Sequence, residues 1–431
     1  MPWVRPAWGR LLLDLLAGEA LRVIIYRRRW ETACLTAHAT TRAGSQVLVP
    51  GLVRHRHRRG VDELTVRMAP GQTLAGWREA CPALASTFGA FSATASPGPW
   101  AGWVRLDVQR RDPLGGERAS TDPARHTSGL VELGRDEYGH TVTIDPTATA
   151  HIGLQGATRS GKSSTCYTLL AALAHRPDVA VVGIDPSGLL LGAFETGPNA
   201  GFIATGTRAD DLDRAADALA RLVHVMDARI TGLRASGVDK LTRFSAASPA
   251  IWCVLEEYPA LLSAARALDS ERGAKPGGRL APRIERAVGR LVKEGAKAGV
   301  CVLVLAQRMS ADALATDDRS NLAVRITLRV DNGDAVAMLH DGITRAGIDA
   351  VRQFNPGVGL VESPGDPLRR VRFHRTDYAT YRARVQAGQA RHSARLDTGD
   401  VIPGRVLHVQ PGTDPATAGA WPGDARLDGA A

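Results

Sequence analysis

The stretch that decides the fold is His151–Ser164, with the sequence HIGLQGATRSGKSS. It reads as a short apolar strand, a glycine-rich loop and the start of a helix. Within it, Gly156, Gly161, Lys162 and Ser163 match the P-loop pattern G-x-x-x-x-G-K-[ST]. Glycines let the backbone wrap a phosphate without a Cβ in the way, and the N–H groups at the start of the helix face the anion. The stretch therefore predicts a nucleotide-binding loop.

The residues of this loop have separate expected roles. We expect Lys162 to reach the β- and γ-phosphates of ATP and the Ser163 hydroxyl to ligate Mg²⁺. The residues expected to bind the nucleotide are Gly156, Ala157, Thr158, Arg159, Ser160, Gly161, Lys162, Ser163 and Ser164. A chance match in a chain with 45 glycines is the alternative. The helical apolar spacing of Thr165–Ala174, directly after the loop, favours the functional interpretation.

Length and composition exclude several classes of protein. A chain of 431 residues, 44% of them hydrophobic, is long enough for two or three domains with a sizeable core. The five cysteines are scattered without a C-x-x-C, so neither a zinc site nor a disulfide framework is indicated, and a cytoplasmic location is expected. No apolar run reaches the ~18 residues of a membrane span. The net charge of +10 favours an acidic partner, either nucleic acid or an anionic membrane surface.

Residues 1–45 form the first predicted region. An amphipathic helix is expected over Leu11–Ile25, followed by the basic run Arg27–Arg29. An ordinary helix packed on its own domain or on a neighbouring subunit is the interpretation that we favour. The alternative is a peripheral membrane contact, because an apolar face beside a basic cluster also suits a bilayer surface.

Residues 46–127 are predicted to form a small α/β domain and a linker. The expected elements are a strand over Leu64–Met68, a helix over Gln72–Phe88 and a strand over Trp103–Gln109. The basic run RHRHRR at Arg54–Arg59 is interpreted as a solvated loop, with phosphate contact as the alternative. Residues 113–127 lack periodicity and are rich in Pro, Gly and Ser, so a linker is expected there.

Residues 128–380 alternate strands and helices, which predicts a largely parallel sheet covered by helices. A hairpin over Leu130–Leu133 and Thr141–Ile144 leads into the P-loop strand, and the later elements are strands over Val179–Ile184, Ile251–Leu255, Val300–Ala306 and Val324–Val330 and helices over Ala209–Leu233 and Arg283–Ala298. Ligands bind at the carboxyl ends of parallel strands. Polar residues follow three of these strands: Asp185, the pair Glu256-Glu257, and Gln307.

The pair Glu256-Glu257 ends the apolar stretch IWCVL, which is the pattern of a Walker B element. We expect Glu256 to hold Mg²⁺ and Glu257 to polarise the attacking water. Gln307 is a candidate sensor of the γ-phosphate. Arg325 and Arg319 are candidates for a finger that reaches a neighbouring subunit's nucleotide, and Arg308 is a weaker one. Lys162, Glu257, Glu256, Gln307 and Arg325 are thus the expected catalytic set.

Several blocks in one order resemble the FtsK/SpoIIIE family of double-stranded DNA translocases, and in particular the TraB-type conjugative transfer proteins of filamentous actinobacteria. The blocks include GATRSGKSS, GIDPSG, VLEEYPALL, GRLVKEGAKAGVCVLVLAQR, RSNLAVRITLRV and NPGVGLVESPG, and the resemblance covers about Gly51–Asp377. The resemblance implies a RecA-like motor in a hexameric ring that threads duplex DNA. It also implies that Gln307 corresponds to the Gln of the family's TQRP block and Arg325 to the Arg of its N-x-P-x-R-I block. The family usually has Asp-Glu where this chain has Glu256-Glu257, and Pro where it has Met309.

The predicted fold class is α/β, with a RecA-like P-loop NTPase motor domain, a smaller N-terminal α/β domain and a disordered tail over residues 381–431. The leading hypothesis is an ATP-dependent translocase of double-stranded DNA that uses Mg²⁺, forms a homo-hexamer and serves conjugative transfer of a plasmid or mobile element. It is expected in the cytoplasm, with a membrane partner as an open alternative. A secretion-type export ATPase is the second hypothesis, because such motors share the same core. A scaffold with a decayed site is the third.

Overall fold

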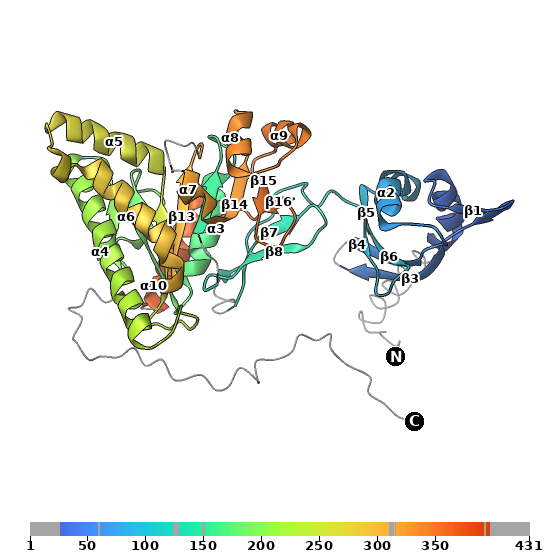
Figure 1. Ribbon diagram of the computed structural model, residues 1–431, viewed down its shortest axis with the longest axis horizontal. Helices are drawn as coiled ribbons and strands as arrows, with labels where there is room; N and C mark the ends of the chain where they lie inside the picture. Colours follow the sequence, from blue (N-terminus) through green and yellow to red (C-terminus); the bar gives the residue numbers. More distant parts are fainter. Residues whose placement is uncertain are drawn as a thin grey trace, which may run out of the picture.

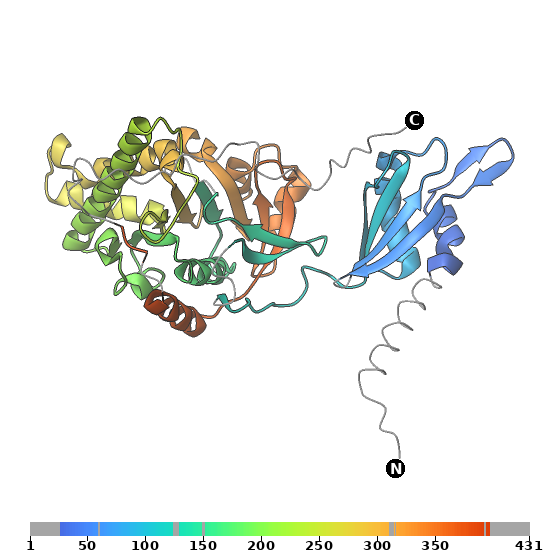
Figure 2. The same cartoon turned by 90° about the horizontal axis from the view of Figure 1, so that it is seen from below.

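Two sheets organise the chain, one of four strands and one of ten. The computed structural model describes residues 26–58, 61–123, 129–148, 151–309, 314, 316–391 and 394–396. The four-stranded sheet belongs to a small N-terminal domain, and an extended segment joins this domain to the larger motor domain (Figure 1 and Figure 2). The helix expected over Leu11–Ile25 lies outside the described residues. None of the described helices is long and apolar enough to cross a bilayer.

The small domain is an antiparallel sheet with helices on one face. Its elements are β1 (Thr41–Ala43), β2 (Gln46–Leu48), β3 (Gly51–Arg58), β4 (Val61–Arg67), α2 (Leu74–Phe88), β5 (Ser92–Pro97) and β6 (Trp103–Gln109), and the sheet order is β3-β4-β6-β5. Helical residues 26–36 and α2 pack on one face of this sheet, around Trp77, Leu84 and Leu106. The helix and the two strands predicted here are present, with boundaries shifted by up to three residues.

The basic run RHRHRR is not a solvated loop, which corrects the prediction. Residues Gly51–Arg58 form β3, which pairs with β4 along its whole length. The two histidines of the run turn inward, and His57 Nδ1 lies 2.6 Å from a carboxylate oxygen of Asp62, which is fully buried. A buried acid on the neighbouring strand β4 therefore fixes which side of β3 faces the core.

The large sheet has the order β11-β10-β12-β13-β9-β14-β15-β16-β7-β8. The strands β11, β10, β12, β13, β9 and β14, at one end of this order, are parallel to one another. Its strands are β7 (Val131–Asp136), β8 (Thr141–Ile144), β9 (His151–Gln155), β10 (Val179–Asp185), β11 (Ile203–Thr205), β12 (Ala250–Leu255), β13 (Val300–Ala306), β14 (Leu322–Leu328), β15 (Val358–Glu362) and β16 (Arg369–Phe373). The P-loop strand β9 and the strand of the two acids, β12, are separated by β13. The predicted parallel sheet is confirmed, and four antiparallel strands extend it beyond β14.

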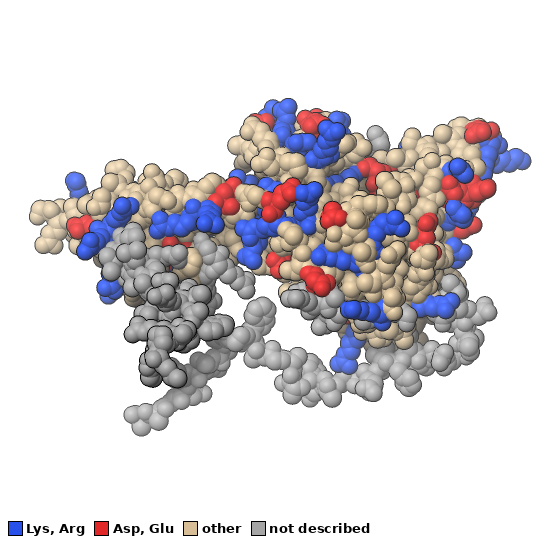
Figure 3. Space-filling view, turned by 180° about the vertical axis from the view of Figure 1, so that it is seen from behind, with Lys and Arg blue, Asp and Glu red and all other residues tan. Residues whose placement is uncertain are grey.

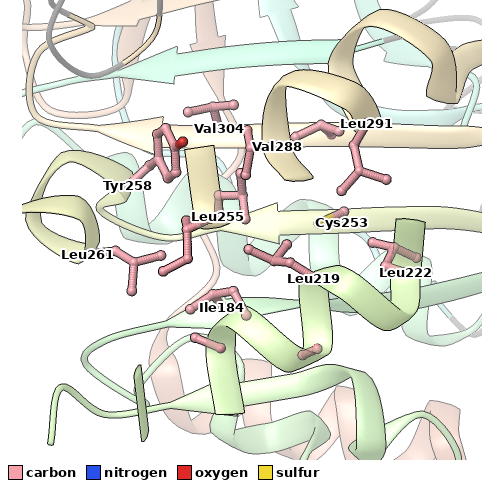
Figure 4. Packing of buried hydrophobic residues seen from close by; sticks show 14 of the residues in the cluster. Ile184, Leu219, Leu222, Cys253, Leu255, Tyr258, Leu261, Val288, Leu291 and Val304 are labelled. Atoms are coloured by element: carbon pink, nitrogen blue, oxygen red, sulfur yellow. The ribbon is translucent and has the colours of Figure 1, made fainter. Parts of the chain in front are cut away.

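Helices cover both faces of the parallel half, which explains its continuous apolar strands. The helices of the motor are α3 (Lys162–Ala174), α4 (Ala209–Ala235), α5 (Tyr258–Glu271), α6 (Leu280–Glu294), α7 (Thr316–Ser320), α8 (Gly333–Leu339), α9 (Arg345–Arg352) and α10 (Tyr378–Arg391), with short 3-10 turns at Gly192–Phe194, Ala200–Phe202, Pro276–Gly278 and Gly295–Ala298. On one face, Ile184, Leu255 and Val304 pack against α4, α5 and α6 (Figure 4). On the other face, alternate residues such as Leu154 and Trp252 pack in the cluster that contains α3 and α10.

The helix α10 corrects the prediction of a disordered tail from residue 381. Its Tyr381 is fully buried, and its ring stacks on Tyr167 of α3 with centroids 4.6 Å apart. Backbone packing is also close here, because a Cβ on Gly388 would collide with the backbone of Ala174. Apart from residues 394–396, the chain beyond Arg391 is outside the described residues.

Part of the expected linker is attached to the motor rather than free. Ala119 forms a parallel bridge with Arg375, and the Arg375 N–H donates to Arg118 O at 2.7 Å. The hydroxyls of Ser120 and Thr376 lie 2.7 Å apart. The small domain therefore connects to the motor beside the segment that follows β16.

Candidate active site

The P-loop follows β9 at the carboxyl edge of the large sheet, between the ends of β13 and β14. The Gly156 N–H donates to Ala306 O, and the Ala157 N–H donates to Arg329 O at 2.8 Å. A Cβ on Gly156 would lie 2.5 Å from Ser160 Oγ and 2.9 Å from Leu328. The first glycine of the motif is therefore required by close packing on the neighbouring strand.

Gly161 is required for a second reason. Its φ of 100° is a left-handed conformation, and a Cβ there would lie 2.6 Å from the backbone nitrogen of Gly357. The Gly357 N–H donates to Ser160 O at 2.7 Å, so the loop before β15 closes on the P-loop. Arg159 also has a positive φ, of 62°. This conformation curls the loop into the concave shape that suits a phosphate.

Donor groups at the start of α3 point out of this loop. The first intrahelical bond runs from the Thr165 N–H to Gly161 O, so the N–H groups of residues 162–164 have no acceptor within the helix. The Ser163 side chain is exposed. The Ser164 hydroxyl, by contrast, is held by Thr376, donating to its carbonyl and accepting from its N–H, both at 3.1 Å. Of the two serines, Ser163 alone has its hydroxyl available.

Lys162 and Glu257 form an ion pair across the site. Their side chains are 12% and 23% exposed, so the pair is largely shielded from water. Glu257 has a φ of 42° and precedes α5, and this left-handed turn directs its carboxylate back toward the P-loop. The structure therefore brings together the P-loop lysine and the second strand-end acid, which come from strands that are not neighbours.

Glu256 has an unusual protonation equilibrium. Burial, together with the carboxylates of Asp185 and Glu257, raises the pKa of Glu256 to about 7, and Lys162 opposes this shift. Asp185 is committed elsewhere, since its two oxygens accept the N–H groups of Ser187, Leu190 and Leu191. Asp185 is therefore part of the turn after β10, and Glu256 is the acid at this edge without a hydrogen-bonded role among the described residues.

The donor set fits a hard divalent cation. A hydroxyl at Ser163 and a carboxylate at Glu256 are oxygen ligands, which Mg²⁺ prefers. Burial and two neighbouring acids raise the pKa of Glu256, and a bound cation would offset the repulsion from those acids as a proton does. No group of three His, Cys, Asp or Glu side chains that could hold a metal occurs among the described residues. Mg²⁺ commonly binds through one or two protein ligands and the nucleotide phosphates, and Ser163 and Glu256 could supply two such ligands.

Gln307 lies at the end of β13, between the strands of the P-loop and of the two acids. Its side chain is exposed, as is that of Arg308. Met309, where the family usually has Pro, is fully buried, and its N–H donates at 2.9 Å to Gln155 Oε1, directly before the P-loop. The turn after β13 is thus attached to the end of β9.

Two of the three candidate finger residues, Arg325 and Arg319, make contacts within the chain. The Arg325 guanidinium lies 3.4 Å from an oxygen of Asp341 and 3.7 Å from one of Glu362, and its side chain is 16% exposed. Arg319 donates to Met309 O at 3.3 Å. Among the three arginines considered, Arg308 is the exposed one at the carboxyl edge.

Sequence reasoning missed Arg329, which follows β14. Its Nη2 donates to Thr158 O of the P-loop at 3.4 Å, and its carbonyl accepts the Ala157 N–H. The strand was predicted over Val324–Val330, which places Arg329 inside it, whereas β14 ends at Leu328 and leaves Arg329 at the carboxyl edge with the other polar residues.

Comparisons with known proteins agree with this geometry. The model of the FtsK/SpoIIIE family matches residues 117–351, more than half of the 431 residues. The chain belongs to the FtsK/SpoIIIE family. The predicted family is therefore confirmed, while the closer likeness to TraB-type proteins stays a prediction. As the family and fold imply, the motor domain is a P-loop ATPase of the FtsK/SpoIIIE type.

Curated relatives are similar over the motor domain. The chain is 30% identical over 210 residues to the DNA translocase FtsK of Streptomyces avermitilis, covering 46% of this chain and 22% of the relative. It is 28% identical over 203 residues to the DNA translocase SftA of Bacillus subtilis, covering 46% of this chain and 20% of the relative. The chain thus spans about a fifth of the length of these relatives.

A solved structure is similar over most of the chain. The pCW3 conjugation coupling protein TcpA, in a monomer form with ATPγS, aligns with a TM-score of 0.50 and 19% identity. The alignment covers 84% of this chain and 98% of TcpA. At this level the likeness supports the fold, and it confirms the predicted P-loop NTPase motor.

Proposed function

We propose that this chain hydrolyses ATP to move double-stranded DNA, and that it serves conjugative transfer of a plasmid or mobile element. Three findings support the proposal: membership of the FtsK/SpoIIIE family, relatives named DNA translocases, and a similar structure named a conjugation coupling protein. We place the small domain at residues 26–112, followed by the linker over residues 113–127, and the motor at residues 128–391, because helical residues 26–36 pack in the core of the small domain and α10 packs on α3.

The observation that carries the proposal is the ion pair between Lys162 and Glu257. Hydrolysis needs a cation on the γ-phosphate and a base beside the attacking water, and these two side chains supply both within one contact. Without nucleotide, each charge neutralises the other. When ATP binds, its phosphates replace the Glu257 carboxylate as the ionic partner of Lys162. Glu257 can then orient the attacking water.

The remaining site residues bind and position the nucleotide. The open backbone N–H groups of residues 162–164, at the start of α3, would hold the phosphates, and Ser163 and Glu256 would hold Mg²⁺. The metal supplies neutralisation of the charge that develops on the transferred phosphoryl group. Gln307 contacts the γ-phosphate or the water from the neighbouring strand end. Arg325 remains the proposed finger residue only if a ring interface opens its two ion pairs.

Assembly and location complete the proposal. We propose a homo-hexameric ring around the duplex, because a trans-acting arginine needs a neighbouring subunit. The ring would work in the cytoplasm, with a membrane partner or a peripheral contact through the N-terminal region. Negative-stain imaging with ATPγS and duplex DNA would report the ring and its occupancy together.

The decisive test measures ATPase activity with and without duplex DNA, and displacement of a third strand from a triplex. We expect duplex DNA to stimulate hydrolysis and the third strand to be displaced. Lys162→Ala removes the charge on the γ-phosphate, so hydrolysis should fall by about 10²–10³-fold. The matched control is Lys275→Ala, since Lys275 is exposed and lies before a short turn remote from the P-loop in sequence.

Two other outcomes contradict the proposal. Hydrolysis that is stimulated by a peptide and not by duplex DNA would favour the export ATPase. Failure of the wild-type chain to bind ATPγS with Mg²⁺ would favour a scaffold with a decayed site.

A further inference from the structure

The small domain presents one face of its sheet without a helix over it. Helical residues 26–36 and α2 pack against the side that carries Leu64, Val104 and Leu106. On the opposite side, the outward residues of β4 and the outward residues Trp103 and Arg105 of β6 are half-buried or exposed, whereas Asp107 and Gln109 at the other end of β6 are buried. A half-covered antiparallel sheet commonly places its polar residues on such a free side.

A β-bulge decides which residues of β3 reach this free side. Leu52 pairs with Val66 and packs in the core, and the register then shifts before Arg54, which pairs with Thr65. The extra residue, Val53, is 50% exposed. Bulges of this kind re-aim the side chains that follow. Here the bulge turns Arg54 and Arg56 outward and His55 and His57 inward.

The inward histidines fix this arrangement. Both histidines lie beside the buried carboxylate of Asp62, with His55 Nε2 at 3.4 Å and His57 Nδ1 at 2.6 Å. The Tyr26 hydroxyl donates to the same carboxylate at 2.8 Å, and Arg110 Nε donates at 3.3 Å. A slip of β3 by one residue would break these contacts, so the outward direction of its arginines is well specified.

Four arginines from three adjacent strands share the free side, and we call this surface the arginine face. Its members are Arg54 and Arg56 of β3, Arg67 of β4 and Arg105 of β6, all exposed. The register places Arg54, Thr65 and Arg105 in one row across the sheet. Arg67 pairs with Trp103 in an adjacent row on the same side. The charges are therefore side by side rather than scattered.

Few acids neutralise the arginine face. Among the described residues, an ion pair is found for Arg105 alone, with Asp107 at 3.5 Å, and Asp107 is 5% exposed. Glu63 is half-buried opposite Arg56. Hydroxyls fill the spaces between the charges, from Thr65, Thr94 and Ser96. Figure 3 shows basic side chains gathered along the small domain with few acidic ones beside them.

We propose that the arginine face binds the phosphate backbone of double-stranded DNA. This inference rests on the proposed function, and it assigns to the small domain a contact with the substrate outside the motor. Arginine and hydroxyl side chains are the groups that most often hold phosphates in protein–DNA interfaces. Residues i and i+2 of a strand are about 6.8 Å apart, close to two axial steps of one DNA strand. Arg54 and Arg56 have this spacing.

The chemistry of the face favours DNA over a membrane. A surface that binds a bilayer inserts apolar area beneath its basic residues. The arginine face carries hydroxyls between its charges, and its apolar side chains stand at its margins: Trp103 and the neighbouring Trp100, which is 67% exposed, Val53 at the bulge, and Val61 at the end near the motor. Flat aromatic rings at one end of a basic surface also suit contact with nucleotides.

The face leads toward the motor. The β7–β8 turn of the large sheet meets the small sheet near Val61, since a Cβ on Gly139 would lie 3.2 Å from Val61. Val61 and Gln109 form the row at this end, and the arginines lie in the following rows. DNA on the arginine face would therefore extend along the small domain from the side of the motor.

The test compares Arg54→Gln/Arg67→Gln/Arg105→Gln with Arg27→Gln/Arg28→Gln/Arg29→Gln in the full chain. Both variants lose three positive charges from the small domain, but the second set lies on the helix that covers the opposite side of the sheet and is exposed there. Duplex affinity is measured by fluorescence anisotropy from 50 to 300 mM salt. Melting temperature and near-ultraviolet circular dichroism check folding.

We expect the first variant to bind duplex DNA about 10–100-fold more weakly, with a log–log salt slope reduced by about 2.7, because each phosphate contact contributes about 0.9. The second variant should bind as the wild type does. Equal slopes for the wild type and the first variant would exclude the arginine face and leave the proposed function intact. No duplex binding by the wild type would exclude both.

A flotation assay separates a membrane role. Vesicles of phosphatidylglycerol and phosphatidylcholine are mixed with the same three proteins. If the first variant lost vesicle binding while its duplex binding was unchanged, the face would be a membrane surface and the proposal would be overturned.

Discussion

The two sheets of this protein expose their polar residues in different places. The ten-stranded sheet has helices over both faces of its parallel half, so its interior strands are apolar throughout and polar residues gather at the carboxyl edge. The four-stranded sheet has helices over one face, so its strands alternate and the other face carries charge. The carboxyl edge of the large sheet brings a few polar side chains together at one point, which suits a small ligand such as ATP. The arginine face distributes its charges across three strands, which suits an extended ligand such as the proposed DNA.

The comparison predicts that the two surfaces can be disabled separately. Changes at the edge should abolish nucleotide chemistry and leave duplex affinity, while changes on the arginine face should do the reverse. Two substitutions at the carboxyl edge of the large sheet test this separation. A third experiment compares how acid affects the stability of the two sheets.

The largest effect is expected for Glu257→Gln. The amide cannot accept a proton from the attacking water, so hydrolysis should fall by about 10²–10⁴-fold. Binding of ATPγS should persist, because the P-loop is unchanged and Lys162 is released from its ion pair. Glu271→Gln, at the exposed end of α5, is the matched control. Hydrolysis within tenfold of the wild type would show that another group orients the water.

A smaller effect is expected for Gly161→Ala. The φ of 100° disfavours a side chain by roughly 1–2 kcal/mol, and the new Cβ would lie 2.6 Å from Gly357 N. The loop must shift, so affinity for ATPγS should fall more than tenfold. Duplex affinity without nucleotide should be retained. Gly278→Ala is the control, since a Cβ there meets open space. Unchanged ATPγS affinity would contradict the prediction, because it would show that the P-loop binds nucleotide equally well after the backbone at residue 161 has shifted away from Gly357.

The smallest effect concerns the response of the two sheets to acid. Burial lowers the pKa of His151, in β9, to about 4 from 6.5. The folded state therefore binds fewer protons than the unfolded state between these values, and its stability is lost as the pH falls from 6.5 toward 4. At pH 5 the loss is about 2 kcal/mol.

The small sheet should resist this acid range. Burial would raise the pKa of Asp62, but the hydrogen bonds from His57, Tyr26 and Arg110 outweigh it, and the pKa is lowered below 3.8. The stability that Asp62 contributes is thus intact at pH 5. Hydrogen exchange at pH 7.5 and pH 5 should show weakened protection in β9 and not in β4. In His151→Asn, whose amide oxygen can still accept the Val302 N–H, free energies of urea unfolding should change less with pH. An equal change in both proteins would contradict the assignment to His151.

The carboxyl edge of the large sheet could be predicted because its signals are local. The P-loop motif is continuous in sequence. An apolar run followed by acids predicts both a buried strand and the residue at which that strand ends. The order of the strands decided that Lys162 meets Glu257 and that Gln307 lies between them, and the sequence alone implied this order only through the family resemblance.

The parts that were missed depend on distant partners. The strand β3 was hidden because its inward positions are histidines, which become core residues only through Asp62 and Tyr26. The stripe of α10 at Tyr381, Val385 and Gly388 was hidden because glycine does not register as apolar, although it allows close contact with α3. The hydroxyl of Ser164 is held by Thr376, more than 200 residues away, which no local pattern indicates, and the prediction that Ser164 binds nucleotide then depends on its backbone N–H.

The attachment of the linker at Ser120 has a mechanical consequence. Ser120 bonds to Thr376, whose backbone bonds to Ser164 and whose hydroxyl lies 2.8 Å from that of Thr168, both in α3. A force on the small domain would therefore reach α3, the helix that follows the P-loop, through a few hydrogen bonds. A flexible linker without these contacts would not transmit it. If the proposals above hold, a force on DNA bound by the small domain would act, through these hydrogen bonds, on the helix that carries the nucleotide site.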